Sequence, residues 1–336
     1  LVGVVAAISA GGAGAVFWMW ITALIGSSTA FVEATLAQLY KEKDPLYGGY
    51  RGGPAYYMHH YVERRTGKTK KHVCIAVLFA ISGLICWAGI SQVISNSVAS
   101  SFENAFGIPP ILTTVILVAV AAVIVLRKNA TVKVLDILVP IMAVFYILGA
   151  LILIIMNIGN FPEALRQIFV GAFNPGAALG GFTGVAVSSA IQYGVARGLF
   201  SNEAGMGSTP HAHAVAKVDH PCDQGLVAIC SVFIDTLIVL NLTAFSVLCT
   251  GQLHEYNQSL TAAELTQAAF ESVYGHFGAI FIAICMFFFA FSTIIGWYFF
   301  GEKNVRYLFK HHPAVAAKVY AAIVVVFIVV GSMLKV

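Results

Sequence analysis

The stretch "GLFSNEAGMGS" (residues 198–208) decides the fold, because it places polar and helix-breaking residues inside a long apolar tract. It holds three glycines, an asparagine, a glutamate and two serines. Glycine destabilises a helix interior, and Asn and Ser side chains compete for local backbone hydrogen bonds. Helical sequence precedes it, "VAVSSAIQYGVA" (185–196), and Pro210 follows it. We therefore expect one helix over 183–215 that is unwound at roughly residues 199–207.

The composition predicts an integral membrane protein of the all-α class. The 336 residues are 59% apolar and only 10% charged, with a mean hydropathy of +0.85, whereas soluble domains have about 25% charged residues. The apolar runs are continuous and not alternating, which favours spanning helices of roughly 20 residues over a β-barrel. The expected spans are 15–37, 73–99, 108–126, 134–156, 183–215, 226–250, 277–300 and 314–333, with a partial one at 1–10.

Basic residues alternate between the two sides of these spans. Lys and Arg crowd the loops at 38–72 and 127–133 and the segment after 300, whereas the alternate loops contain only Arg166. Cytoplasmic loops of membrane proteins collect Lys and Arg. We therefore expect the first group of loops to be cytoplasmic, in a multi-pass protein of a prokaryotic cell membrane.

Three segments outside the spans have amphipathic patterns. Residues 261–278 and 159–169 are expected to form helices on the outer side. Residues 50–65 are expected to lie on the lipid headgroups of the cytoplasmic side, since tyrosines prefer that depth. The tyrosines concerned are Tyr56, Tyr57 and Tyr61.

The expected break frees backbone groups at membrane depth, which is tolerable only if they are buried in protein or line a cavity. In secondary transporters such groups bind an anionic substrate group and Na⁺. Glu203 and Arg197 either stabilise the kink or contact substrate or ion directly, and the residues leave both possibilities open. The better candidates for touching a small ligand are Phe200, Gly205, Met206 and Gly207.

A second polar cluster lies in "FFFAFSTIIGWYFFGEK" (287–303). Ser292 and Thr293 lie three and four residues after Phe289, so all three share a helix face, and Trp297 is one turn further. Two hydroxyls beside a carbonyl suit a hard cation, which takes oxygen ligands. The alternative is that both hydroxyls bond back to carbonyls of the preceding turn.

Other polar residues favour structural roles. Gln92 and Asn96, in the segment 86–101, could bond between helices. Glu33 and Asp235 are ionisable residues within spans, for which a structural role is expected. The histidines in "HAH" (211–213) are expected at a loop end and not in a metal site. The sequence contains no nucleophile–base pair, so no enzyme is predicted.

Four long segments resemble one transporter family. They are "GGAGAVFWMWITALIGSSTAFVEATLAQLYKEKD" (11–44), "GGPAYYM" (52–58), "ARGLFSNEAGMGSTPHAHAVAKVDHPCDQGLVAICSVFIDTLIV" (196–239) and "FAFSTIIGWYFFGEK" (289–303). They closely resemble the alanine/glycine:cation symporters, also called the sodium:alanine symporter family. The resemblance covers nearly the whole chain.

The resemblance implies a LeuT-type fold with two inverted repeats of five helices and broken first and sixth helices. The interrupted 183–215 tract then corresponds to the sixth helix and 277–300 to the eighth. The opening "LVGVVAAIS" (1–9) resembles the last part of the broken first helix. We therefore expect residues 1–336 to form a single transporter domain that lacks the start of the first helix and the helices after the ninth.

The family pattern assigns residues to two sites. Thr293 and Trp297 match substrate positions of the eighth helix, and Ser292 with Thr293 matches its sodium hydroxyls; Phe289 shares that face. Many relatives carry a third-helix glutamine before an Asn-Ser pair, but Ile94 stands there in this chain, with Gln92 two residues earlier. This departure leaves the identity of the neutral amino acid open.

The sequence thus predicts a symporter that couples Na⁺ to the uptake of a small neutral amino acid, of the alanine or glycine class, by alternating access. The alternatives are H⁺ coupling, with Glu203 as the titrating group, and Na⁺-coupled transport of another neutral amino acid such as glutamine. The expected partners are the amino acid, Na⁺ as the co-transported ion and the lipid bilayer, without an organic cofactor or nucleic acid. The protein is expected to function as a monomer.

Overall fold

The chain folds as a bundle of helices with one short hairpin. The computed structural model describes residues 1–45, 48–126, 130–173, 183–255 and 261–333. The elements of the first half are α1 (Val2–Gly11), α2 (Ala15–Leu39), β1 (Glu42–Lys43), β2 (Tyr50–Arg51), α3 (Pro54–Thr66), α4 (Cys74–Phe106), α5 (Pro110–Leu126), α6 (Ala130–Met156), η1 (Ile158–Asn160) and α7 (Phe161–Phe173). Those of the second half are α9 (Thr183–Asn202), α10 (Pro210–His213), α11 (Pro221–Phe233), the π-helix η2 (Ile234–Leu240), α12 (Asn241–Cys249), α13 (Gln252–Glu255), α14 (Ala262–Tyr274), α15 (His276–Leu308) and α16 (Pro313–Met333).

Six helical stretches among the described residues are long and apolar enough to cross a membrane. They are Ala15–Leu39, Cys74–Phe106, Val139–Met156, Pro221–Cys249, His276–Leu308 and Pro313–Met333. Each matches an expected span, so the prediction of a multi-pass helical membrane protein is confirmed. The helices at the chain start and at Pro110 are shorter, and the 183–215 tract is interrupted.

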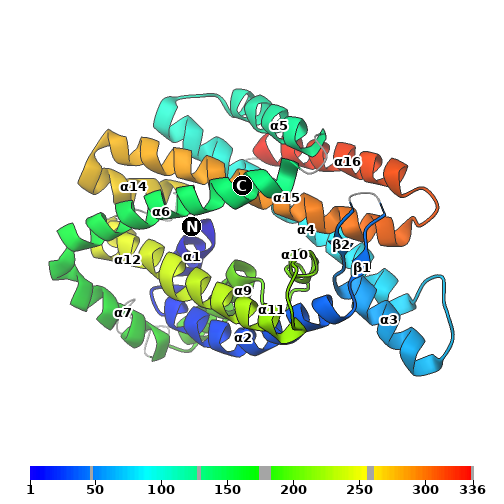
Figure 1. Cartoon of the computed structure of the whole chain (residues 1–336). Helices are drawn as coiled ribbons and strands as arrows, with labels where there is room; N and C mark the ends of the chain where they lie inside the picture. Colours follow the sequence, from blue (N-terminus) through cyan, green and yellow to red (C-terminus); the bar gives the residue numbers. More distant parts are fainter. Residues whose placement is uncertain (46–47, 127–129, 174–182, 256–260, 334–336) are drawn as a thin grey trace.

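The helices associate in two groups. In one, α2 packs against α9 and α11, and α1 packs against α9; in the other, α4 packs against α15, α16 and α5. Figure 1 shows the first group in the lower half of the view and the second in the upper half. Helix α10 contacts both α2 and α15. The chain therefore passes between the two groups where the sequence predicts a break.

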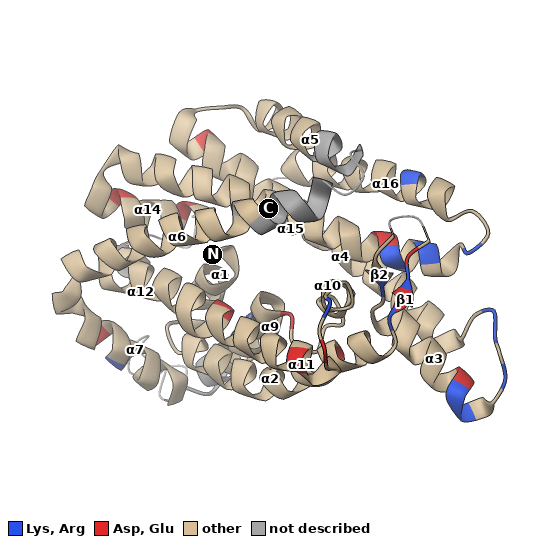
Figure 2. Ribbon diagram, in the orientation of Figure 1, with Lys and Arg blue, Asp and Glu red and all other residues tan. Residues whose placement is uncertain are grey.

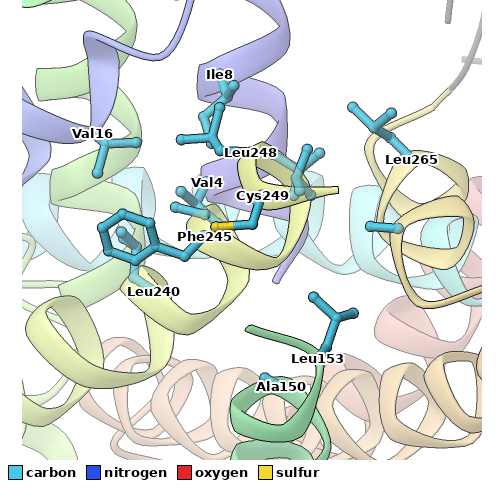
Figure 3. Close-up of a cluster of buried hydrophobic side chains, with 14 of the residues drawn as sticks. Val4, Ile8, Val16, Ala150, Leu153, Leu240, Phe245, Leu248, Cys249 and Leu265 are labelled. Atoms are coloured by element: carbon cyan, nitrogen blue, oxygen red, sulfur yellow. The ribbon is translucent and has the colours of Figure 1, made fainter. Parts of the chain in front are cut away.

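The largest apolar core lies where α1 meets the second half of the chain. Figure 3 shows Val4 and Ile8 of α1 beside Phe245 and Leu248 of α12, with Leu153 of α6 nearby. All of these side chains are at most 9% exposed. Because α1 is apolar all round, it is stable as a buried element and not as a surface helix.

The expected short helices outside the spans are confirmed. Helix α14 lies within 261–278, and η1 with α7 covers 159–169. Both begin with helix-start chemistry: Thr261 and Glu264 form a capping box, and Glu163 lies in the first turn of α7. The capping box satisfies free backbone N–H groups at the start of α14, and the negative charge of Glu163 suits the positive end of the α7 dipole.

Basic side chains gather at one end of the molecule. Figure 2 shows Lys and Arg around α3, the β1–β2 hairpin and the C-terminal end of α15. The hairpin is antiparallel and pairs Glu42 with Arg51 and Lys43 with Tyr50. We call this the basic end; its elements are those expected to be cytoplasmic.

The prediction that Tyr56 lies among lipid headgroups is wrong. Its side chain is 3% exposed, its hydroxyl donates to the Lys303 carbonyl (3.1 Å), and its ring packs edge-on against Tyr307. Helix α3 contacts α4 and α15, so one of its faces is covered by protein. Tyr61, on another face, is 54% exposed.

A buried ion network joins the hairpin segment to α15. Asp44 Oδ2 accepts from Lys303 Nζ at 2.8 Å and lies 3.3 Å from an Arg306 guanidinium nitrogen. Arg306 also bonds to Glu302. Asp44, Lys303 and Arg306 are each at most 4% exposed. A buried ion keeps its charge only where partners replace water, so these groups hold the basic end of α15 in one position.

The first prediction concerns this network. Asp44→Asn leaves two buried cations with one carboxylate fewer, and loss of one partner of a buried pair costs about 3–5 kcal/mol. We expect a large fall in the unfolding temperature of the purified protein. Glu163→Gln is the matched control, because the Glu163–Arg166 pair is about half exposed and such pairs contribute under about 1 kcal/mol. Equal falls for the two variants would contradict the proposed role of Asp44.

Candidate functional site

The helix break lies slightly later than expected. Helix α9 continues to Asn202 and α10 begins at Pro210, so residues 199–202 are helical and 203–209 are not. Within that segment Gly205 and Gly207 have φ of +85° and +74°. Glu203 has φ of +54° and is the one non-glycine residue with positive φ among the described residues. A left-handed glutamate is strained, and such strain persists only where surrounding contacts hold it.

Side chains supply the partners that the broken helix lacks. Asn202 Oδ1 accepts from the Ala204 N–H (3.1 Å), and Glu33 Oε2 accepts from the Gly205 N–H (3.3 Å). Glu203 Oε2 accepts from the Ser208 hydroxyl (2.6 Å). Asn202 and Glu33 of α2 therefore cap backbone N–H groups of the break, and Glu203 bonds to a side chain across it. The sequence predicts a structural role for Glu33, and this contact supplies one.

A cavity of about 200 Å³ opens beside the break. Its walls bring together four residues that the sequence analysis singled out, from two separate segments: Glu203, Ser292, Thr293 and Trp297. Val139, Gly296 and Phe300 complete the lining. Pockets for drug-sized ligands measure about 300–1,000 Å³, so this volume suits a smaller molecule.

The hydroxyls of α15 meet at one carbonyl. Ser292 Oγ and Thr293 Oγ1 donate to the Phe289 carbonyl oxygen at 2.9 and 2.7 Å. This is the back-bonding arrangement that the sequence left open as the alternative. A hydroxyl that donates its proton keeps its oxygen lone pairs, so the cluster still presents acceptor capacity on the side of the cavity. Back-bonding and cation binding are therefore compatible here.

An aromatic cluster backs the cavity. Trp297 is 3% exposed, and its ring lies 6.0 Å from that of Trp87 and 5.7 Å from that of Phe300. Phe200, Met206 and Ile94 pack against the same cluster. These three side chains do not line the cavity. They pack behind Trp297 and Phe300, whose rings do line it.

The other predicted residues lie elsewhere. Gln92 lies against α16, where its backbone approaches Gly331, and Asn96 Nδ2 donates to the Gly331 carbonyl (3.3 Å). Helix-to-helix bonding, which the sequence favoured for this segment, is thus present for Asn96. Gly205 is exposed on the break, and Gly207 lies beneath Phe79. Arg197 lies in α9, away from the cavity lining.

The prediction that His211 lies at a loop end is wrong. Its side chain is fully buried in α10, and its ring stacks on Phe300 at 5.6 Å. Nδ1 lies 2.8 Å from the Ser208 carbonyl, which can only accept, so Nδ1 carries the proton. Nε2 then accepts from Asn304 Nδ2 (3.0 Å). No group of three metal-ligating side chains exists among the described residues. His211 therefore ties the break to α15.

Comparison with known sequences identifies relatives along the whole chain. The model of the sodium:alanine symporter family matches residues 1–336. YrbD of Bacillus subtilis, named as a candidate sodium/proton-dependent alanine carrier, is 45% identical over 323 residues, which cover 92% of this chain and 63% of that protein. GlnT of B. subtilis, named a probable sodium/glutamine symporter, is 40% identical and covers 100% of this chain and 67% of that protein.

An archaeal relative and one solved structure extend the comparison. The sodium/alanine symporter AgcS of Methanococcus maripaludis is 39% identical, over 92% of this chain and 66% of that protein. The chain thus spans about two thirds of the length of these relatives. A mutant manganese transporter of Eremococcus coleocola has a similar fold, with a TM-score of 0.62 and 14% identity over 98% of this chain and 66% of that one.

The second prediction concerns the two glycines of the break. A methyl group at Gly207 would come within 2.7 Å of the Phe79 ring, whereas at Gly205 the nearest atom is 3.7 Å away. An alanine at either position must adopt the left-handed backbone conformation, which costs about 1–2 kcal/mol. Gly207→Ala adds an overpacking cost of about 1–3 kcal/mol. We expect Gly207→Ala to lower the unfolding temperature more than Gly205→Ala; equal shifts would show that Phe79 yields freely.

Proposed function

Because the chain belongs to the sodium:alanine symporter family, whose members are transporters and not enzymes, we propose that the complete protein couples Na⁺ influx to uptake of a small neutral amino acid of the alanine or glycine class. The observation that carries this proposal is the small cavity where Glu203 of the break meets Thr293 and Trp297 of α15. The protein is a multi-pass membrane protein, and we place it, as a monomer, in the cell membrane of a prokaryote.

We propose a LeuT-type arrangement for the fold. In it, α9 and α10 are the two halves of the broken sixth helix, α15 is the eighth, and α1 belongs to a broken first helix. The two helix groups support this assignment, because α1, α2, α9 and α11 pack together while α4, α5, α15 and α16 form the second group. Alternating access would then be a relative movement of the two groups around the cavity.

The lining of the cavity suits a zwitterion with a short side chain. The Glu203 carboxylate offers an acceptor for an ammonium group, and the Thr293 hydroxyl offers a polar contact beside it. Trp297 and Phe300 form an apolar wall for the side chain. The volume of about 200 Å³ accommodates a small amino acid.

For the co-transported ion, we propose that Na⁺ takes the Phe289 carbonyl and the hydroxyls of Ser292 and Thr293 as ligands. The Ser292 and Thr293 hydroxyl oxygens lie 2.9 and 2.7 Å from the Phe289 carbonyl oxygen. Hard cations select oxygen donors of this kind. Because Thr293 also lines the cavity, one residue would sense both ion and amino acid, which is a direct physical route to coupling.

Two relatives support specific alternatives. The name of YrbD includes proton dependence, and Glu203, which bonds to Ser208, is the carboxylate that lines the cavity and would carry the proton. GlnT is named for glutamine, and Gln92 does not line the cavity, so it does not restrict which neutral amino acid enters.

The third prediction tests the coupling ion. In proteoliposomes containing the complete protein, we expect an imposed Na⁺ gradient to drive accumulation of labelled alanine, and an imposed proton gradient at equal Na⁺ to drive none. Accumulation with the proton gradient alone would replace Na⁺ with H⁺ coupling. A competition panel that includes glycine and glutamine in the same vesicles identifies the preferred amino acid.

The fourth prediction separates the two roles on α15. Thr293→Val removes one oxygen of the proposed ion site while keeping the shape, so the Na⁺ concentration for half-maximal uptake should rise at least tenfold, equivalent to about 1.4 kcal/mol. Trp297→Phe enlarges the cavity and should relax selectivity toward larger neutral amino acids, with Na⁺ activation little changed. The reverse pattern would show that the ion and amino-acid sites have been exchanged.

A further inference from the structure

A second cavity, separate from the break, lies at the basic end. Its volume is about 230 Å³, and it is bounded by the β1–β2 hairpin, α3, the end of α15 and the start of α16. Three cations from different elements line it, namely Arg51, Arg306 and Lys310. We call it the basic pocket. The transport cycle proposed above makes no use of it.

Two of these cations are already neutralised within the protein, and the third is not. Arg51 pairs with Glu42 at 3.0 Å, and Arg306 pairs with Asp44 and Glu302. Among the described residues, no carboxylate lies within 4.0 Å of Lys310. Its Nζ donates to the Lys71 carbonyl at 2.8 Å, which uses one of three N–H groups. The pocket therefore carries an excess positive charge at Lys310.

The neighbouring histidines respond to that charge. Burial first, and the positive charge of Lys310 second, lower the pKa of His59, which lines the pocket, while Glu63, 3.3 Å from His59 Nε2, opposes that shift. Burial, Lys310 and Lys71 together lower the pKa of His72 in the same way. Burial is the first cause in both cases, and the positive charge of Lys310 adds to it, which agrees with the excess positive charge that the contacts place at Lys310.

The surroundings of the pocket point to a membrane ligand. An exposed basic segment runs from the last turn of α3 into the loop after it, comprising Arg64, Arg65, Lys68, Lys70 and Lys71. Figure 2 shows this segment at the same end of the molecule as the C-terminal end of α15. Apolar side chains are exposed in the first turns of α4 and α16, the helices that start at this end. They are Ile75, Leu78, Val315 and Val319. The cations match the anionic headgroup of a phospholipid, and the adjacent apolar surface matches its acyl chains.

We propose that the basic pocket binds the phosphate group of an anionic phospholipid headgroup, with Lys310 as its principal contact and the acyl chains against the first turns of α4 and α16. The Tyr307 ring, 5.2 Å from Lys310 Nζ, helps to hold that ammonium group at the pocket. A free phosphate has the same headgroup chemistry without the acyl chains. The bound lipid would link the hairpin, α3 and α15, whose mutual position the buried ion network also sets.

The experiment uses the complete protein in a neutral detergent and follows its unfolding temperature. Three probes are titrated separately: dioctanoyl phosphatidylglycerol, dioctanoyl phosphatidylcholine and inorganic phosphate. The variants are Lys310→Gln and Lys310→Arg, with Lys318→Gln as the matched control, because Lys318 is an exposed lysine of α16 outside the pocket lining. The unfolding temperature without any probe reports whether each variant is folded.

We expect phosphatidylglycerol to raise the unfolding temperature of the wild type, the Lys318→Gln variant and the Lys310→Arg variant alike. Because the Lys310→Gln variant loses one lysine contact, its half-saturating concentration of phosphatidylglycerol should be about fivefold higher than that of the wild type. Identical titrations for Lys310→Gln and Lys318→Gln would overturn the proposal, as would an equal response to phosphatidylcholine. An equal response to inorganic phosphate would overturn the assignment to a lipid and give the pocket to a soluble phosphate compound.

Discussion

The constraint on which the structure depends is that backbone polar groups at membrane depth must find partners inside the protein. The chain breaks the α9–α10 tract for seven residues, and side chains bond to polar groups of that segment: Asn202 to Ala204, Glu33 to Gly205, and Ser208 to Glu203. Two of these partners lie inside the segment or next to it, and the third comes from α2. The break is therefore stable only when α2 and α9 are packed together.

The same contacts connect the break to the second helix group. His211 accepts from Asn304 of α15 through Nε2 and donates through Nδ1 to the carbonyl of Ser208, and Ser208 in turn bonds to Glu203 at the cavity. Lys303, next to Asn304 in the chain, pairs with Asp44. Polar contacts thus run from the cavity to Asn304, and its chain neighbour Lys303 is held at the basic end by Asp44. In a transporter that moves two helix groups against each other, such contacts between the groups are where binding and movement can be coupled.

Much of the fold and part of the site could be predicted from the sequence. The spans follow from hydropathy, because the length and apolar composition that let a helix cross a membrane are properties of its own residues. The break follows from three glycines and a proline in one tract. Its predicted start was four residues too early, since residues 199–202 remain helical and Asn202 is buried against Thr236. Ser292, Thr293 and Trp297 were recognisable because three- and four-residue spacing places them on one helix face.

The residues that were misplaced share a physical reason. His211 looks like a loop residue and Tyr56 like an interfacial one, because local sequence reports polarity and not which protein surface covers a side chain. Glu33 caps an N–H group 172 positions away in the chain, a contact that no local pattern encodes. The sequence by itself determined the membrane class, the spans, the break and the family. Only the tertiary structure decided that Glu203, Thr293 and Trp297 share one cavity, that Glu33 completes the break and that Lys310 faces a pocket, because each of these depends on how helices distant in sequence pack together.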